Sequence, residues 1–541
     1  MNFKSNISRT KPLFLYQIKN NWAILKELKA NTVRFAAMIK NIVTIFMAAG
    51  FPFLLAAQTK PSLKEAGKFA SAITAADLKK YLSILASPEM EGRETATEGQ
   101  RKAAAFIENR FKELGLKPGI GSEYQQYYPV YRDSVTHAII KLNNKTLNLN
   151  RDFTVNPANY PAKLGVSEIV YINFEDSLWK DSKIPVSGKV VMFFAKGLQQ
   201  AGPQQNFGGV ILTRISQVMQ RGAVAALVVQ DIFPVSNPDP LSNMLFDVYS
   251  SRQNINYYSI SPSVAADALG VTTDDITNNK LGSRAFTVKT WLEYDEKKLE
   301  LQSSNVLGLL EGTDKKDEYL VITGHYDHLG KRGETIYYGA DDDGSGTVGV
   351  LEIAEAFVAA KAAGKGPRRS LLFMTVSGEE KGLWGSRYYS DNPVYPLDKT
   401  TANLNIDMIG RLDSIHIKND TTQYVYLVGD DKLSSDLRSI TDLANKYTKL
   451  QLDPKYNDPK DPQRIYFRSD HYNFARKGVP ILFYFSGLHP DYHRPTDTVD
   501  RINFPEYEKR ARLVFYTAWE MANRQDMLKR DIPLPSSAMT R

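Results

Sequence analysis

The sequence predicts an α/β fold in which a mixed, largely parallel central sheet is flanked by helices and is interrupted by an inserted β-rich domain. From about position 300 onward, apolar runs such as 319–323 and 370–376 alternate with helical stretches such as 347–362. Strands separated by helices are typical of βαβ units. Between about 155 and 297 the pattern changes to short β-rich runs between turn-rich stretches, which indicates the insertion.

The chain of 541 residues is longer than one typical domain of about 100–200 residues. Two amphipathic helices, over about 74–85 and 97–114, open the main domain, because their apolar residues recur at helical spacing. We expect a leader over 1–58, the first part of the main domain over 59–157, the insertion over 158–297, a metal-binding part over 298–525 and a C-terminal tail over 526–541.

The positive charge of the chain lies mainly in its leader. Eight of the 68 basic residues but only one of the 60 acidic residues fall within positions 1–58. The remainder is therefore nearly neutral, and the net charge of +8 does not indicate a nucleic-acid partner.

The leader carries an apolar run over 41–57 that follows Lys40 and ends in Ala56 and Ala57. This pattern fits a secretory signal peptide, and the run is shorter than the ~20 apolar residues of a membrane span. We expect an exported protein, periplasmic or secreted, with no membrane span after signal removal, and with Met38 as the true start. An uncleaved N-terminal anchor is the alternative.

The insertion shows a strand-and-glycine pattern. Residues 187–191, the stretch 215–222 leading into 223–229, and the segment 259–262 carry this pattern. Together they resemble a protease-associated domain. The alternative is an unrelated inserted β domain.

The chain contains no cysteine. Disulfides, thiolate metal ligands, a cysteine nucleophile and a lipidated N-terminal cysteine are therefore excluded. Any bound metal must be held by histidines and carboxylates.

Histidines and acids follow the predicted strands of the main domain. His325 comes after the run 319–323, and Asp327, two residues later, can accept the second N–H of a ligating imidazole. Three consecutive acids, Asp341 to Asp343, lie in a glycine-rich loop before a helix. Like charges at this spacing are costly unless a cation compensates them, although a calcium loop or a solvated acidic turn would share the pattern.

Three further segments continue this series. Glu379 and Glu380 follow the run 371–376, and such a pair can divide metal binding from proton transfer. Asp407 stands between two apolar residues, where an unpaired charge would be costly to bury. His493 comes late in the chain, across a loop from another apolar run. Each segment alone has a plain structural explanation, but the ordered set of five nitrogen and oxygen donors suits zinc.

These segments resemble the zinc aminopeptidase family, the M28-type di-zinc metallopeptidases, which also contains glutamate carboxypeptidases and glutaminyl cyclases. The matching segments are His325-Tyr-Asp327, Gly339 to Asp342, Glu379-Glu380, Asn405-Ile-Asp407 and Tyr492-His493. A protease-associated domain ahead of the metal segments is a known arrangement in this family.

The resemblance implies a pair of zinc ions. Asp342 would bridge both ions, one of which also takes His325 and Asp407, and the other Glu380 and His493. Glu379 would be the general base.

The same resemblance implies roles around these ligands. Asp327 would support His325, and Asp341 and Asp343 would tune or orient Asp342. Tyr492 would donate a hydrogen bond to the developing oxyanion, although it could instead only pack. Asp470 and His471 lie in a segment that lines the substrate pocket in the family.

The function that we expect is therefore removal of N-terminal residues from peptides by an exported di-zinc aminopeptidase. A dipeptide carboxypeptidase would need a cation for the substrate's C-terminal carboxylate, for which Arg411, Arg468 and Arg494 are candidates. A glutaminyl cyclase uses a single zinc ion, and a degenerate binding protein would have lost a ligand or the base, so the complete set disfavours both. Calcium or magnesium binding is disfavoured by two imidazoles. The sequence carries no indication of oligomeric state.

Overall fold

The computed structural model describes residues 62–195, 207–231, 233, 240–247, 254–419 and 422–534. The predicted leader, including the signal peptide and Met38, lies outside the described residues, as do residues 535–541 of the predicted tail. Within the described part of the chain, no helix combines the length and the apolarity that crossing a bilayer requires.

Four neighbouring parallel strands form the centre of the main sheet. In spatial order they are β17 (Ile481–Phe485), β14 (Thr400–Ile406), β10 (Lys315–His325) and β13 (Arg369–Val376). Antiparallel β15 (Tyr424–Val428) continues the sheet beyond β17, and antiparallel β9 (Arg284–Leu310) continues it beyond β13. The short β16 (Gln451–Asp453) pairs with β15, and the short β1 (Lys117–Pro118) pairs with β9. The predicted mixed, largely parallel sheet is confirmed.

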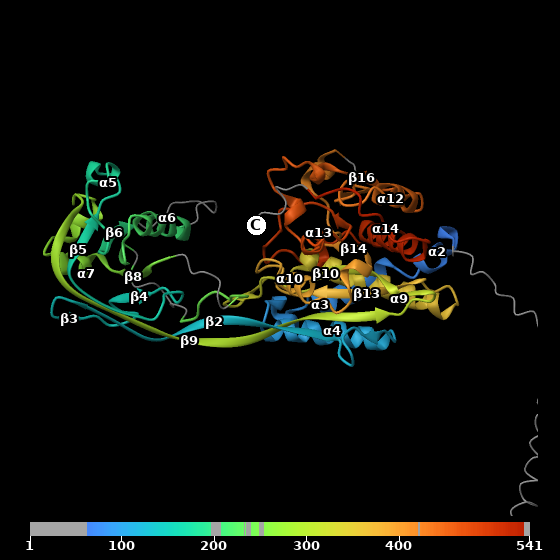
Figure 1. Cartoon of the computed structure of the whole chain (residues 1–541), viewed down its shortest axis with the longest axis horizontal. Coiled ribbons are helices and arrows are strands. Elements are labelled where there is room, and N and C mark those ends of the chain that lie inside the picture. The colour runs from blue at the N-terminus through green and yellow to red at the C-terminus, as the bar shows by residue number, and fades with distance from the viewer. Residues whose placement is uncertain are drawn as a thin grey trace, which may run out of the picture. The chain divides into compact units, whose positions relative to one another are not determined.

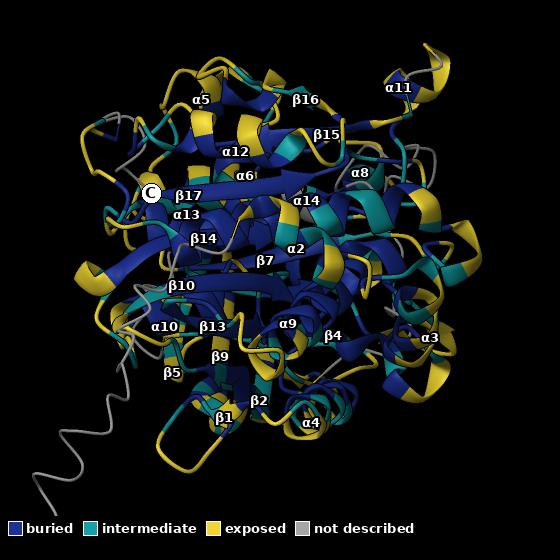
Figure 2. Ribbon diagram, turned by 90° about the vertical axis from the view of Figure 1, so that its right-hand side faces the viewer, coloured by how far each residue is buried: buried dark blue, intermediate teal, exposed yellow. Residues whose placement is uncertain are grey.

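The central strands are covered on both faces. Every residue of β13, β14 and β17 is buried, as the dark blue ribbons of Figure 2 show. Such continuous apolar runs are typical of parallel strands packed between two layers. The polar residues in these runs bond to one another, since Asn403 donates to Thr323 and Thr323 donates to Asn405.

Helices cover both faces of this sheet. One core packs against α2 (Leu63–Ala70), α3 (Ala75–Leu85), α4 (Glu98–Glu113), α9 (Gly346–Ala362), α12 (Leu437–Asn445) and α14 (Phe504–Asn523). The other core includes α10 (Trp384–Asp391) and α13 (His471–Ala475). The shorter elements are α11 (Ser414–Lys418), β11 (Lys331–Arg332), β12 (Thr335–Ile336) and the single turns η1 (Pro88–Arg93), η2 (Ala340–Ser345), η3 (Leu397–Lys399), η4 (Lys455–Asn457), η5 (Ile465–Phe467) and η6 (Val499–Arg501).

Local capping explains the two predicted opening helices. The Thr74 side chain accepts a hydrogen bond from the backbone N–H of Asp77 at 3.1 Å, so α3 begins where the sequence predicted. The α4 helix ends at Glu113, and Gly115 adopts a φ of +72°, which glycine tolerates without steric cost.

The strands of the insertion continue the same sheet beyond β9. Strands β5 (Ala162–Ile172), β6 (Val190–Ala195), β7 (Ala225–Gln230) and β8 (Asn256–Ile260) are parallel, and β4 (Phe153–Val155) is antiparallel to β8. Its helices are α5 (Ser177–Lys180), α6 (Phe207–Gln220), α7 (Pro262–Leu269) and α8 (Thr273–Thr277). The predicted β-rich insertion is thus itself a mixed α/β unit, because helices connect its parallel strands.

Two long strands pass from one hydrophobic core to the other. Strand β2 (Gln125–Leu142), which also pairs with β3 (Lys145–Thr146), follows β9 along its length (Figure 1). Ile140 and Phe153 belong to the core of the insertion, although both precede position 158. The core of the insertion therefore draws on residues from both sides of the predicted boundary.

Part of the insertion packs against the main domain. The ring of Phe246 lies 5.9 Å from that of Tyr128, 5.8 Å from that of Trp384 and 6.5 Å from that of Tyr388. Trp384 begins α10, five residues after Glu379. The segment 240–247 is therefore anchored beside the turn that carries the two glutamates.

Candidate metal centre

The predicted ligands meet at the carboxyl edge of the parallel strands. His325 is the last residue of β10, Asp407 directly follows β14, and Glu380 follows β13. Asp342 lies in η2, between β10 and α9, and His493 lies in the loop after β17. Because parallel strands end at the same edge, segments far apart in the sequence converge there.

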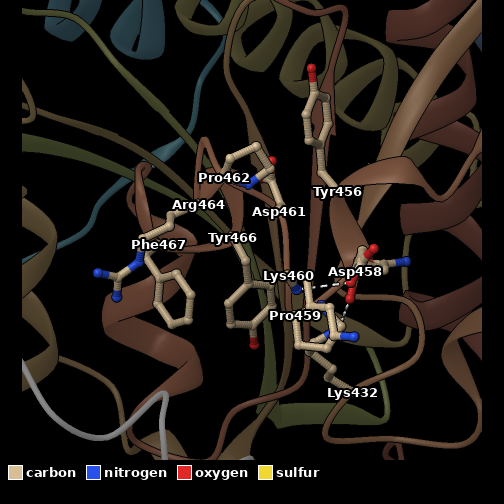
Figure 3. Close-up of a pocket in the computed structure, with 11 residues that line it drawn as sticks. Lys432, Tyr456, Asp458, Pro459, Lys460, Asp461, Pro462, Arg464, Tyr466 and Phe467 are labelled. Carbon is tan, nitrogen blue, oxygen red and sulfur yellow. Dashed lines mark hydrogen bonds between the residues drawn. The ribbon is translucent and has the colours of Figure 1, made fainter.

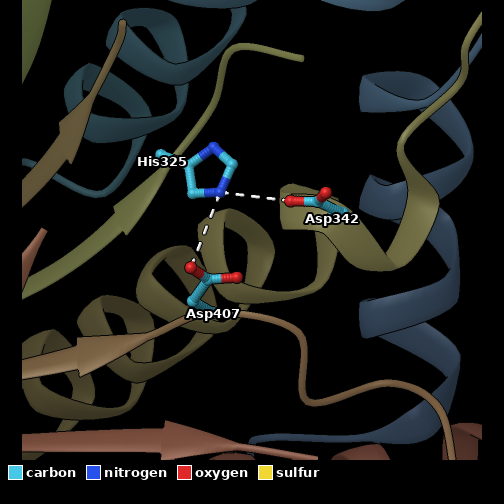
Figure 4. Close-up of side chains that lie close together, drawn as sticks. All are labelled: His325, Asp342 and Asp407. Atoms are coloured by element: carbon cyan, nitrogen blue, oxygen red, sulfur yellow. Dashed lines mark ion pairs between the residues drawn. The ribbon is translucent and has the colours of Figure 1, made fainter. Parts of the chain in front are cut away.

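The first cluster contains His325, Asp342 and Asp407. The Nε2 atom of His325 lies 3.3 Å from Oδ1 of Asp342 and 3.7 Å from Oδ2 of Asp407 (Figure 4). One ligand atom from each of the three residues lies within 4.8 Å of the others. This spacing leaves room for one ion between the three side chains.

The second cluster shares Asp342. The Nε2 atom of His493 lies 3.1 Å from Oδ2 of Asp342 and 3.2 Å from Oε2 of Glu380. The two carboxylate oxygens of Asp342 thus face different clusters, Oδ1 toward His325 and Oδ2 toward His493. This is the arrangement that a bridging carboxylate requires.

His328 also belongs to the second cluster, although no motif in the sequence predicted a role for it. Its Nδ1 atom lies 2.8 Å from Oε1 of Glu380 and 3.8 Å from Oδ2 of Asp342. The one available signal was its place three residues after His325, in the same segment.

Buried polar atoms without partners indicate cations at this site. Nε2 of His325, Oδ2 of Asp342 and Oε1 of Glu380 are buried and have no hydrogen-bond partner among the described residues. Leaving such groups uncompensated is costly. Imidazole and carboxylate donors without thiolates suit zinc, so the residues present fit a pair of zinc ions.

The ionisation of the ligands reflects their mutual attraction. Burial raises the pKa of Asp342, but the neighbouring imidazoles of His325 and His493 outweigh it and hold that pKa well below its usual range. Burial lowers the pKa of His493, but the carboxylates of Asp342 and Glu380 outweigh it and raise that pKa to about 10.

Glu379 lies beside the first cluster. Its Oε2 atom is 4.0 Å from Nε2 of His325, and its backbone N–H donates to Oδ1 of Asp327 at 3.2 Å. Burial, with the charge of Glu380 adding to it, raises the pKa of Glu379 well above its usual range. A carboxylate with raised proton affinity suits a general base.

Asp327 connects His325 to Glu379. Its Oδ1 atom lies 3.7 Å from Nδ1 of His325, while the Asp327 carbonyl oxygen is closer to that nitrogen, at 3.1 Å. Its Oδ2 atom accepts a hydrogen bond from Thr95 at 2.7 Å. The Asp327 carboxylate therefore holds the Glu379 backbone as well as facing the imidazole.

Asp343 organises the backbone around the site. Its carboxylate accepts hydrogen bonds from the backbone N–H groups of His325 at 3.0 Å, Gly346 at 2.7 Å and Met408 at 3.0 Å. These bonds tie together the ends of β10 and β14 and the start of α9. Burial raises the pKa of Asp343 well above its usual range.

His489, which the sequence left unassigned, contacts another of the three consecutive acids. Its Nε2 atom lies 3.4 Å from Oδ2 of Asp341. The Oδ1 atom of Asp341 accepts from the backbone N–H of Gly410 at 2.7 Å. Asp341 and His489 thus lie behind the clusters that surround Asp342.

A pocket opens beside Asp342, Glu379 and Asp407. Its other lining residues are Met408, Ile465, Arg468, Phe483, Phe485, Leu488 and Tyr492. Tyr492 stacks on His493 with ring centroids 3.8 Å apart, and its hydroxyl accepts a hydrogen bond from Arg468 at 3.0 Å. Apolar side chains, three acids, Arg468 and Tyr492 thus all contribute to the lining of the pocket.

Asp470 and His471 are fully buried and lie behind the pocket wall rather than in its lining. Asp470 accepts a hydrogen bond from Ser386 at 2.5 Å, and burial raises its pKa to about 7. His471 donates through Nε2 to the carbonyl of Tyr466 at 2.8 Å and stacks on Phe483, which does line the pocket. Burial lowers the pKa of His471 to about 3, so it is neutral.

A second hollow borders the same segment of chain. Tyr456, Tyr466, Phe467 and Lys432 contribute to its lining (Figure 3). Ile465 faces the pocket at the metal clusters, whereas the next two residues face this hollow. The η5 turn therefore separates the two spaces.

Comparison with known proteins agrees with this geometry. The model of peptidase family M28 matches residues 305–518, which include all the clustered residues. A probable leucine aminopeptidase of Trichophyton verrucosum is 26% identical over 285 residues, or 51% of this chain and 71% of the relative. One of Arthroderma otae is 29% identical over 216 residues, or 38% of this chain and 55% of the relative. The chain thus spans about half the length of the second relative.

A solved structure shares the fold. The aminopeptidase from Aneurinibacillus sp. strain AM-1 aligns with a TM-score of 0.51 over 87% of this chain and 98% of that chain, at 17% sequence identity. The shared architecture extends over more of the chain than the family model matches.

Proposed function

The chain belongs to peptidase family M28, and on this premise we propose that it is an aminopeptidase that uses two zinc ions to hydrolyse the N-terminal peptide bond of its substrates. The observation that carries this proposal is the orientation of Asp342, whose two oxygens face two separate clusters of donors beside Glu379. Two further acids, Asp407 and Glu380, and two imidazoles lie around the Asp342 carboxylate, and this set of donors suits a pair of zinc ions.

The chemistry divides between the metals and the chain. When bound, a zinc pair lowers the pKa of water and polarises a carbonyl oxygen. Glu379 takes the proton of the attacking water and returns it to the leaving amine. Asp327 holds the backbone of Glu379, so the base stays beside the first cluster.

Tyr492 is placed to stabilise the developing oxyanion. Its hydroxyl oxygen accepts the N–H of Arg468, so its own proton remains free to point into the pocket. Because the ring stacks on His493, the hydroxyl is held beside the second cluster. A fixed donor at this place stabilises the negative charge of the transition state.

The lining of the pocket favours an apolar N-terminal residue. Met408, Ile465 and four more apolar or aromatic side chains contribute to it, together with carboxylates that attract a free ammonium group. The names of the two relatives also specify leucine.

Arg468 supports a second candidate function, a dipeptide carboxypeptidase. It lines the pocket and forms no ion pair with the described residues, whereas Arg411 pairs with Asp491 at 2.7 Å and Arg494 is exposed. Arg468 is therefore the one of the three predicted candidates that could receive a substrate carboxylate.

A matched peptide panel distinguishes the two candidates. Purified residues 58–541 with zinc are offered one peptide in three forms: unmodified, N-acetylated and C-amidated. We expect cleavage of the unmodified and amidated forms only. Cleavage of the acetylated form with loss of the amidated one would favour the carboxypeptidase, and no cleavage of any form would refute the proposed peptidase activity.

Export of the protein is part of the proposal. It is supported by the apolar run over 41–57 behind Lys40. N-terminal sequencing of the mature protein from the periplasm or the medium should begin shortly after Ala57, whereas a cytoplasmic chain that still carries 41–57 would contradict export.

A further inference from the structure

His328 directs an unpartnered ring nitrogen into the second cluster. Nδ1 lies 2.8 Å from Oε1 of Glu380, and both atoms are buried without an assigned hydrogen-bond partner among the described residues. His325 shows the same relation in the first cluster, where Nε2 faces Asp342 and Asp407 without a hydrogen bond. Both nitrogens therefore face a space between two carboxylates.

The ring of His328 is fully buried and locked in place. Gly339 packs against it so closely that a Cβ atom at Gly339 would lie 2.5 Å from Cγ of His328. The backbone N–H of His328 donates to the carbonyl of Arg93 at 3.2 Å. The imidazole thus cannot turn away from Glu380 and Asp342 without moving the loop that carries Gly339.

Arg93 fixes both loops around this ring. Its guanidinium is fully buried and donates to the carbonyl oxygens of Tyr326 at 2.7 Å, Tyr338 at 2.8 Å and Gly339 at 2.9 Å. One side chain therefore connects the segment that carries His328 to the segment that packs on its ring. This preorganises the imidazole before any ion arrives.

We propose that His328 is a ligand of the second metal position, through Nδ1, in addition to His493, Glu380 and Asp342. The inference rests on the proposed zinc pair and assigns the second position four protein donors, compared with three for the first. The distances of 2.8–3.8 Å from Nδ1 to the two carboxylates are close to the separation of about 3.3 Å between tetrahedral zinc ligands at ~2.0 Å.

Four donors at one position predict a redundancy. Loss of either imidazole should leave three protein donors, so a second zinc ion should still bind, at least tenfold more weakly. Loss of both should leave only the two carboxylates and abolish binding at this position. The matched variants are His328→Leu, which fills the buried space without a donor, His493→Ala, and the double variant.

Zinc binding by the metal-free proteins tests this directly, without recourse to activity. Stoichiometry is measured by elemental analysis and affinity by competition with a chromophoric chelator. We expect two zinc ions in wild type, two with one weakened at least tenfold in each single variant, and one in the double variant. His328→Asn, whose side-chain carbonyl oxygen can lie near the Nδ1 position, should recover part of the affinity.

Two results would overturn the inference. If His328→Leu binds both ions as tightly as wild type, and circular dichroism shows that it is folded, His328 is no ligand. If His493→Ala alone already abolishes the second ion, His328 does not supply a donor there. A wild-type protein that binds a single ion would refute the proposed zinc pair itself, and the inference with it.

Discussion

Glu352 is a carboxyl group buried in α9 without a hydrogen-bond partner among the described residues. Burial, followed by the negative charges of Glu355 and Asp77, raises its pKa from 4.5 to about 8. Arg110 opposes this shift but is itself paired with Glu355. Glu352 is therefore protonated in the native protein at neutral pH and ionised in the unfolded chain.

Replacement of Glu352 by Gln should alter how stability depends on pH. Between pH 4.5 and about 8 the native state holds a proton that the unfolded state has lost, so the free energy of unfolding falls as pH rises through this window. The shift corresponds to about 5 kcal/mol at most, and water penetration around the ionised group reduces it. We expect Glu352→Gln to match wild type near pH 5 and to be more stable by about 2–4 kcal/mol near pH 8.5.

Urea unfolding followed by circular dichroism at pH 5, 6.5 and 8.5 measures this difference. EDTA keeps the protein metal-free, so that the pH dependence of zinc binding does not contribute. Glu334→Gln serves as the control, because the Glu334 side chain is exposed, and its loss should leave the pH profile unchanged. If wild type and Glu352→Gln lose stability in parallel as pH rises, the assignment of a raised pKa to Glu352 is refuted.

Four further predictions concern the site and its surroundings. Glu379→Gln should retain zinc but lose about 10²–10⁴-fold in kcat, because it removes the proton acceptor; near-normal turnover would exclude this role. Tyr492→Phe should lower kcat by about tenfold or more with little change in KM, and an unchanged kcat would leave Tyr492 with a packing role. Zinc affinity should rise from pH 6 to 8, because His493, whose pKa is about 10, must lose a proton to bind zinc. Calorimetry in two buffers of different ionisation enthalpy would detect the proton that is released on binding. Phe246→Ala should release segment 240–247 for limited proteolysis, since its ring anchors that segment, and an unchanged cleavage rate would show that other contacts suffice.

The strands of the main sheet could be predicted because short apolar runs in the sequence indicate buried strands. Residues 370–376 form an uninterrupted apolar and small-residue run, and they lie within β13, which is buried throughout. Asp407, an acid at the end of such a run, lies where the parallel strands end. The convergence of the ligand segments follows from this topology.

The surroundings of the site could not be predicted in the same way. Asp470 and His471 belong to a segment near the pocket, but the sequence cannot show that they face away from it, with Phe483 between His471 and the pocket. In the insertion, the strands were predicted but their parallel pairing was not, because pairing depends on how the helices between them cross over.

By itself, the sequence determined the family that the chain resembles and the order of its candidate metal donors. Four of the five donors follow a recognisable strand, and the absence of cysteine limits any metal ligands to nitrogen and oxygen. Only the tertiary structure decided how the two oxygens of Asp342 are divided between two clusters, and that His328 faces one of them. Those contacts depend on Arg93 and Gly339, which are separated by more than 200 positions in the sequence and meet only through loop packing. Periodicity within a few residues reports burial and secondary structure, whereas the direction of a side chain at a site is set by neighbours that no local pattern contains.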